Sequence, residues 1–319
     1  MKYIEVGTSG VKASNLIMGC MRLKGKTLKE AEEIIRTAMD CGINYFDHAD
    51  VYGSAGQRGE CEEIFGKAVG LSRPSVRESM IIQSKCGIIK SEVGAYDFSK
   101  EHILEAVDGI LSRLGTEYLD FLLLHRPDAL MEPEEVAEAF DTLYQAGKVR
   151  HFGVSNHRPL QVELLQKYLP YKLEINQLHL SIVHCPMIDS GIAANMEIPQ
   201  GYDKTGSVLE YSRLREMTIQ AWSPFQQGDF VSSSSANPFL GDYEHYGRLN
   251  EVINRLAAKY GVTNTAIAVA WITRHPANIQ VILGSMNIQR IQDACQGSEI
   301  PLTREEWYEI YQAAGKQLP

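Results

Sequence analysis

Four polar residues of the sequence have side chains that could together donate a proton to a reacting oxygen: Asp47, Tyr52, Lys85 and His125. A tyrosine is a weak acid, but a nearby ammonium group favours the phenolate and lowers the pKa of the phenol. A carboxylate paired with the lysine would keep that lysine charged and in place. An imidazole could donate a hydrogen bond to a substrate oxygen and orient it. The four residue types therefore fit a site that protonates a carbonyl as it becomes an alkoxide.

Each of these four residues lies at or just after the end of a predicted β-strand. Asp47 ends the stretch NYFD, Lys85 ends MIIQSK, His125 ends FLLLH, and Tyr52 follows in the loop ADVYG. Taken singly, each residue also has a plain structural interpretation as a turn, packing or solvated residue. When parallel strands close into a barrel, however, their C-terminal ends all meet at one mouth. A barrel would therefore bring the four side chains together.

Short apolar runs alternate along the chain with longer amphipathic stretches, as expected for strands and helices of an α/β fold. After a hairpin at 1–12, strands are predicted at 15–20, 43–47, 79–84, 118–124, 150–155, 173–177, 217–222 and 279–283. Helices are predicted at 27–41, 57–69, 99–113, 133–146, 157–168, 205–215, 246–259 and 287–297, with extra helices at 263–274 and 303–314. Thr27, Ser99 and Asn156 occupy positions typical of N-caps.

Eight strand–helix alternations predict a (β/α)8 TIM barrel with an N-terminal β-hairpin and extra helices, and an open doubly wound sheet is the competing architecture. We find no internal linker, so residues 1–319 are expected to form one barrel domain. Segments 182–204 and 225–244 are too long for tight connections, and loops of this length are usually functional or mobile.

Composition limits the partners and the compartment. The sequence has 31 Lys and Arg against 40 Asp and Glu, and the resulting charge of −9 disfavours nonspecific binding to nucleic acid or anionic membrane. The six cysteines form no C-x-x-C pair, which is typical of reduced thiols in the cytosol. The first residues lack a signal peptide, and no apolar run is long enough to span a bilayer. We therefore expect a cytoplasmic protein whose partner is a small carbonyl compound; its oligomeric state stays open.

Familiar cofactor and metal motifs are missing from the sequence. There is no G-x-G-x-x-G dinucleotide fingerprint, and Gly19 and Gly25 are separated by five residues where a P-loop needs four. His179 and His184-Cys185 lack a convincing third ligand, and their odd spacing on a strand would place the two histidines on opposite faces. No metal is expected.

Several ordered stretches nevertheless resemble one family: YFDHADVYG at 45–53, QSKCG at 83–87, LLLHRPD at 122–128, GKVRHFGVSN at 147–156 and AWSPF at 221–225. Over nearly its full length the chain is similar to the aldo-keto reductases, and RHFGVSNH with LLLHRPD and LTREEW resembles a bacterial subgroup of uncharacterised members. The resemblance implies NADPH-dependent, reversible reduction of an aldehyde or ketone to an alcohol, with NADH less favoured. It implies Tyr52 as general acid, Lys85 and Asp47 tuning it, and His125 orienting the carbonyl.

The resemblance also implies which residues would hold the cofactor. Ser155, Asn156 and Gln177 would hold the nicotinamide carboxamide, and Trp222 replaces the aromatic residue that stacks on the nicotinamide ring. Further cofactor contacts would come from Gly19, Cys20, Met21, Asp47, Ser223, Pro224, Phe225, Gln227, Gly228, Gly284, Ser285, Arg290 and Asp293. Gly284 and Ala294 stand where the family often has lysine and asparagine, which weakens the case for NADP over NAD. Each position also has a structural interpretation, such as a helix cap for Ser155-Asn156 or a core aromatic for Trp222.

Two other functions remain open from the sequence. The chain could be a nicotinamide-sensing subunit that binds a partner protein on the same scaffold, although an intact set of four polar residues disfavours this. It could also be an unrelated barrel lyase or isomerase. Segment 186–201 is less similar to the family, and loops of this kind set substrate choice, so the natural substrate is not readable.

Overall fold

The protein folds as a closed barrel of eight parallel strands. The computed structural model describes residues 1–90, 93–225 and 239–319. The strands are β3 (Leu16–Gly19), β4 (Tyr45–Asp47), β5 (Ile81–Cys86), β8 (Leu119–Leu124), β9 (Val149–Ser155), β10 (Leu173–His179), β11 (Thr218–Trp222) and β12 (Gln280–Leu283). They pair in chain order, and β12 closes the barrel on β3. The predicted barrel is confirmed and the open sheet is wrong; no strand boundary differs by more than two residues from the prediction.

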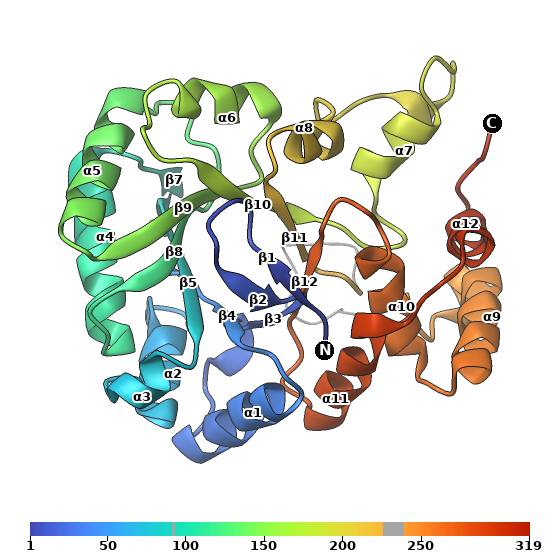
Figure 1. The fold of residues 1–319 in the computed structure, drawn as a ribbon, viewed down its shortest axis with the longest axis horizontal. Helices are drawn as coiled ribbons and strands as arrows, with labels where there is room; N and C mark the ends of the chain where they lie inside the picture. Colours follow the sequence, from blue (N-terminus) through green and yellow to red (C-terminus); the bar gives the residue numbers. More distant parts are fainter. Residues whose placement is uncertain (91–92, 226–238) are drawn as a thin grey trace.

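Helices surround this barrel, as Figure 1 shows. They are α1 (Leu28–Asp40), α2 (Glu60–Val69), α3 (Pro74–Arg77), α4 (Lys100–Leu114), α5 (Pro133–Gln145), α6 (Pro159–Gln166), α7 (Pro186–Ile192), α8 (Val208–Leu214), α9 (Tyr243–Tyr260), α10 (Asn264–Thr273), α11 (Ile288–Gln296) and α12 (Arg304–Ala313). Three 3-10 turns, at Met21–Leu23, Pro199–Gly201 and Gly297–Glu299, and a short hairpin of β6 (Ile88–Ile89) and β7 (Ala95–Tyr96), add to them. None of the helices in the described residues is both long and apolar enough to cross a membrane.

Side chains at the first helical turns explain where two of the helices begin. The Thr27 hydroxyl accepts from the backbone N–H of Glu30, whose carboxylate accepts in return from the Thr27 N–H, which forms a capping box for α1. The Ser99 hydroxyl caps α4 by accepting from the N–H of His102. The predicted cap Asn156 is wrong, because α6 begins three residues later at Pro159 and Asn156 has a left-handed φ of 62°.

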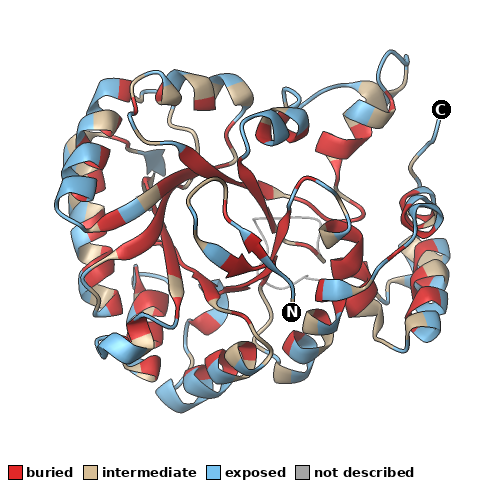
Figure 2. Ribbon diagram, in the orientation of Figure 1, coloured by how far each residue is buried: buried red, intermediate tan, exposed pale blue. Residues whose placement is uncertain are grey.

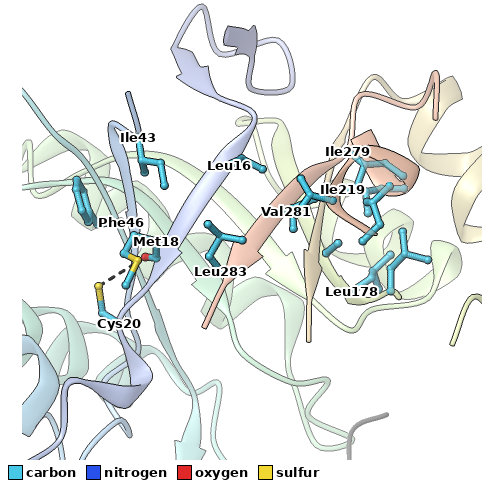
Figure 3. Close-up of a cluster of buried hydrophobic side chains, with 14 of the residues drawn as sticks. Leu16, Met18, Cys20, Ile43, Phe46, Leu178, Ile219, Ile279, Val281 and Leu283 are labelled. Atoms are coloured by element: carbon cyan, nitrogen blue, oxygen red, sulfur yellow. Dashed lines mark hydrogen bonds between the residues drawn. The ribbon is translucent and has the colours of Figure 1, made fainter. Parts of the chain in front are cut away.

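The apolar core has two parts. Inside the barrel, side chains such as Ile17, Phe121 and Ile175 form a small cluster, and a larger one fills the space between the strands and the helices. Figure 3 shows part of the larger cluster, where side chains of β3, β11 and β12 pack together. The barrel strands are consequently buried on both faces (Figure 2), which explains why β8 reads as an unbroken run of apolar residues after Asp120.

The N-terminal hairpin lies across one end of the barrel in Figure 1. It consists of β1 (Tyr3–Glu5) and β2 (Lys12–Ser14), so it extends two residues beyond the predicted range. Val6 and Ala13 belong to the cluster inside the barrel, and the hairpin therefore closes the N-terminal end of the strands. The opposite end, where the strands terminate, is left for the candidate site.

Residues near the C-terminus hold the segment that follows β10. Asp189 of α7 accepts from the Tyr311 hydroxyl (2.9 Å) and pairs with the Lys316 ammonium (2.7 Å). The Gln200 amide donates to the Tyr311 hydroxyl and to the backbone carbonyl of Gln317, both at 2.9 Å. The long segment predicted at 182–204 is therefore not a bare loop, because it contains a helix and is tied to the end of the chain.

Candidate active site

The structure brings together the four polar residues predicted at the strand ends. The Lys85 ammonium donates to Asp47 Oδ1 and to the His48 carbonyl, each at 2.6 Å, and its side chain is fully buried. Its nitrogen lies 5.1 Å from the centre of the Tyr52 ring. The Tyr52 and His125 rings meet edge to face with their centres 5.9 Å apart. One compact group therefore contains an ion pair, a phenol and an imidazole.

Backbone hydrogen bonds fix the loop that carries Tyr52. The N–H of Asp50 donates to the Lys85 carbonyl (3.0 Å), and the N–H of Cys61 donates to the Tyr52 carbonyl (3.2 Å). The next residue is Gly53, where a Cβ would lie 1.9 Å from the carbonyl oxygen of Gln57. Only glycine fits there, so Gly53 is a requirement of the turn that carries Tyr52.

The protonation of the site differs from the sequence prediction in one respect. Burial raises the pKa of Tyr52 well above its ordinary value, and the charge of Asp47 raises it further. In the protein alone the pKa of Tyr52 is therefore raised overall, whereas the sequence led us to expect a lowered one, and the phenol keeps its proton. Burial also lowers the pKa of His125 well below its usual range, with Lys85 and Arg126 adding to the effect, so the imidazole is neutral. Burial lowers the pKa of Lys85, and the charge of Asp47 opposes that change.

A second group of predicted residues surrounds the ends of β9, β10 and β11. The Trp222 indole N–H donates to Asn156 Oδ1 (3.1 Å), and the Asn156 amide donates to the Ser155 hydroxyl (2.8 Å). That hydroxyl donates to the Gln177 carbonyl at 3.0 Å. Asn156 and Ser223 have positive φ angles of 62° and 52°, and such backbone strain is concentrated at functional sites. Ser155, Asn156, Gln177 and Trp222 are therefore neighbours.

The half-buried Trp222 ring has histidine on one side. His179 stacks on it with ring centres 4.2 Å apart, and His184 stacks on His179 at 3.8 Å. The prediction that odd spacing places the two histidines on opposite faces is wrong, because β10 ends at His179 and the following turn brings His184 back over it.

The remaining predicted cofactor residues fall into two groups. Near β3, Gly19 and Cys20 are buried and the Cys20 thiol donates to the Met18 carbonyl (Figure 3), so of the predicted trio Gly19–Met21 only Met21 is exposed. After β11, Pro224 is buried and Ser223 and Phe225 are half-buried. Gln227 and Gly228 lie outside the described residues.

Four further predicted residues lie at or near the start of α11. Asn287 caps this helix by accepting from the N–H of Arg290. The Arg290 side chain is exposed and forms no ion pair with any residue that the structure describes, whereas Asp293 accepts from the Gln289 amide at 2.9 Å. A Cβ at Gly284 would meet no heavy atom within 4 Å, so the space beside it is open. Together with Ser285, these groups fit the phosphate-bearing end of a dinucleotide.

Sequence reasoning missed three residues of the site. The Arg126 guanidinium lies 5.8 Å from the centre of the Trp222 ring, and the buried amides of Gln83 and Gln220 lie inside the barrel beneath Asp47. A signal for the two glutamines is present: each precedes a predicted site residue by two positions on the same strand, and residues two apart share a face. Two surface hollows, one lined in part by Asn15 and the other by Thr218, lie at the opposite end of the barrel, where the strands begin.

Comparisons with known proteins agree with this geometry. A sequence model of the Aldo/keto reductase family matches residues 15–314. Oxidoreductase YdhF of Escherichia coli is 35% identical over the whole of both chains, and a 6-dehydroglucose reductase of Novosphingobium aromaticivorans is 31% identical over 99% of this chain and 97% of its own. A crystal structure of the thermostable aldo-keto reductase Tm1743 with the inhibitor epalrestat superposes with a TM-score of 0.75 at 23% identity, covering 98% of this chain and 100% of the other.

These matches exclude an unrelated barrel lyase or isomerase. They place the chain among enzymes that use nicotinamide cofactors, and the relatives named above from bacteria are oxidoreductases. The protein therefore belongs to the aldo/keto reductase family and is an oxidoreductase.

Proposed function

We propose that the protein reduces an aldehyde or ketone to an alcohol with NADPH, and that Tyr52 is its general acid. The observation that supports this most directly is the buried Lys85–Asp47 ion pair beside two neutral rings, Tyr52 and His125. When bound, NADPH would supply the hydride that adds to the carbonyl carbon. The protein must then stabilise and protonate the oxygen on which negative charge develops.

The protonation state of each side chain determines its role in this step. Tyr52 keeps its proton because burial raises its pKa, so it can release that proton to an alkoxide, which is a far stronger base. The neutral His125 has a buried Nδ1 without a hydrogen-bond partner among the described residues, so its ring is available to orient a carbonyl oxygen. The Lys85 ammonium then stabilises the tyrosinate after proton transfer, and Asp47 holds that ammonium in place.

The residues around β9 to β12 fit the cofactor. Ser155, Asn156 and Gln177 present hydroxyl and amide groups suited to a carboxamide, and Trp222 presents an aromatic ring beside them. Ser223, Pro224 and Phe225 continue the rim towards the pyrophosphate. Gly284, Ser285, Arg290 and Asp293 provide open space and a cation for the adenosine end, and the cation favours NADPH over NADH.

The test is NADPH oxidation with a panel of aldehydes and ketones, by the wild type and by Tyr52→Phe. The panel includes 6-dehydroglucose because two relatives are named 6-dehydroglucose reductases. We expect Tyr52→Phe to lower kcat by about 10²–10⁴-fold, the usual contribution of general acid catalysis, with NADPH affinity almost unchanged.

Tyr144→Phe is the matched control, because Tyr144 is an exposed tyrosine on α5 whose ring packs at a tilt against Tyr171. Normal turnover by Tyr52→Phe would remove Tyr52 from the acid role. A wild type that binds NADPH but turns over no member of the panel would instead favour the nicotinamide-sensing alternative.

A further inference from the structure

A row of four buried glutamines lies inside the barrel beneath the site, and we refer to Gln83, Gln177, Gln220 and Gln280 as the glutamine chain. They come from β5, β10, β11 and β12, and none is more than 3% exposed. The Gln280 amide donates to the Ser14 carbonyl (2.8 Å), and the Gln220 amide donates to Gln280 Oε1 (3.1 Å). Gln83 and Gln177 in turn donate to Gln220 Oε1 at 2.9 and 3.1 Å. Buried amides are costly when unpaired, and these are paired throughout.

At the end nearest the candidate site, the glutamine chain contacts the carboxylate of Asp47. Gln83 Nε2 donates to Asp47 Oδ1 at 2.5 Å and Gln177 Nε2 donates to the same oxygen at 3.1 Å. Lys85 is the third donor to that oxygen, at 2.6 Å. Strand pairing places Gln83 directly opposite Asp47. The register of β4 and β5 therefore sets the shorter of the two amide hydrogen bonds to Asp47. The hydrogen-bonded glutamines inside the barrel therefore end at the Asp47 carboxylate, which holds Lys85.

Hydrogen-bonding capacity fixes the orientation of these amides. An ionised carboxylate has no hydrogen to donate, so the amide nitrogens must face Asp47. The other end of the Gln83 amide is held by Tyr45, whose hydroxyl donates to Gln83 Oε1 at 2.8 Å. Hydrogen bonds linked in this way polarise one another and strengthen the terminal contact. Asp47 thus receives two neutral donors that stabilise its negative charge and restrict its rotation.

We propose that Gln83, supported by Gln220, is a positioning residue of the reaction: it holds the Asp47 carboxylate in one orientation, so that Lys85 stays beside Tyr52. This inference rests on the proposed function, because it acts through the roles assigned to Lys85 and Tyr52. Gln83 itself is shielded from the substrate by burial, so its effect is on the rate of the chemical step and not on substrate binding.

The first test compares Gln83→Met with Gln280→Met. Both glutamines are fully buried members of the glutamine chain, but Gln280 does not contact Asp47. We expect Gln83→Met to lower kcat about tenfold, the low end of what one hydrogen bond to a charged group contributes, with KM and NADPH affinity within about twofold. Gln220→Met should be intermediate and Gln280→Met within about twofold of wild type. Equal losses of kcat in all three variants would show a structural role alone and overturn the proposal.

The second test is the pH profile of Gln83→Glu. A protonated glutamic acid can donate to Asp47 in place of the amide, whereas an ionised glutamate repels it. Burial and the neighbouring carboxylate both raise the pKa of the new group. We therefore expect kcat of Gln83→Glu to fall as pH rises, with a limb that is absent from the wild type and from Gln280→Glu. A profile identical to wild type would contradict the proposal, and this test holds even if Gln83→Met fails to fold.

A third measurement separates this inference from the proposed function. In urea unfolding, Gln83→Met and Asp47→Asn should be non-additive, whereas Gln280→Met and Asp47→Asn should be additive. A wild type without carbonyl reduction would defeat the proposed function and, with it, the positioning role of Gln83. Normal reduction by the wild type, loss of activity in Tyr52→Phe and additive unfolding of Gln83→Met with Asp47→Asn would defeat this inference alone.

Discussion

Removing the ammonium group of Lys85 should lower the free energy of unfolding of the protein as well as slow the reaction. Lys85 is fully buried and the Asp47 side chain is only 4% exposed, so water cannot replace the lost partner. In Lys85→Met, the carboxylate keeps its amide donors Gln83 and Gln177 but loses its counter-ion, and the His48 carbonyl loses its donor. Breaking a buried ion pair by removing one partner costs about 3–5 kcal/mol, and we expect this loss of unfolding free energy.

The double variant Asp47→Asn/Lys85→Met separates this stability effect from catalysis. It removes the uncompensated charge, while the asparagine still accepts from the amides of Gln83 and Gln177. Exchanging a buried ion pair for neutral side chains is often close to neutral, so the double variant should be at least about 2 kcal/mol more stable than Lys85→Met. Its turnover should stay as low as that of Lys85→Met, because the Lys85 ammonium is then missing beside Tyr52.

Urea unfolding at pH 7 and NADPH turnover of the same preparations measure the two effects. The single variant Asp47→Asn, which keeps Lys85, is the control for losing the carboxylate alone and should cost less activity than Tyr52→Phe. A Lys85→Met protein within about 1 kcal/mol of the wild type would refute the account of a buried, mutually dependent pair. Recovery of turnover in the double variant would refute the role of Lys85 beside Tyr52.

Two further predictions concern cofactor choice and acid stability. Arg290→Met should weaken NADPH binding about tenfold and leave NADH binding unchanged. A charge-assisted contact to the 2′-phosphate contributes roughly 1.5–3 kcal/mol, and we expect the low end because Gly284 adds no second cation. Fluorescence titration measures both affinities, and equal affinities of the wild type for the two cofactors would contradict the prediction. Burial, followed by the charge of Lys85, lowers the pKa of His48 to about 3. Between pH 6.5 and 3 the imidazole of the unfolded chain therefore binds a proton that the native imidazole does not bind. The free energy of unfolding consequently falls as the pH falls through this range. His48→Phe should reduce this loss by up to about 1.4 kcal/mol per pH unit, and urea midpoints at pH 7 and 5 that shift equally in both proteins would disprove the assignment.

The sequence was sufficient to predict the barrel and the proximity of the four polar residues at its strand ends, because both depend on periodicity. Strands buried on two faces read as apolar runs, and a polar residue at the end of such a run stands out, as His125 does after β8. The same logic failed for Asn156, where a left-handed residue precedes the helix and the cap lies elsewhere. It also failed for the pKa of Tyr52, because the sequence shows that a lysine is near but not how deeply the phenol is buried.

Contacts between distant parts of the chain were not predictable in this way. Gln83 and Gln280 are separated by almost 200 residues, and each alone reads as an unremarkable polar residue in a strand. Their connection depends on which side chains face inward and on the register between neighbouring strands. Period-two spacing could have placed Gln83 on the same face as Lys85, but the partners of its amide required the folded barrel.

The links between Asp189 and the C-terminal residues Tyr311 and Lys316 have a practical consequence for engineering. Segment 186–201 is not an independent module, because its anchors lie more than a hundred residues downstream. A chimera that exchanges 186–201 between relatives must therefore transplant 311–317 with it. For the same reason an affinity tag fused after Pro319 is separated by only three residues from Lys316, so a tag at the other end of the chain disturbs this anchor less.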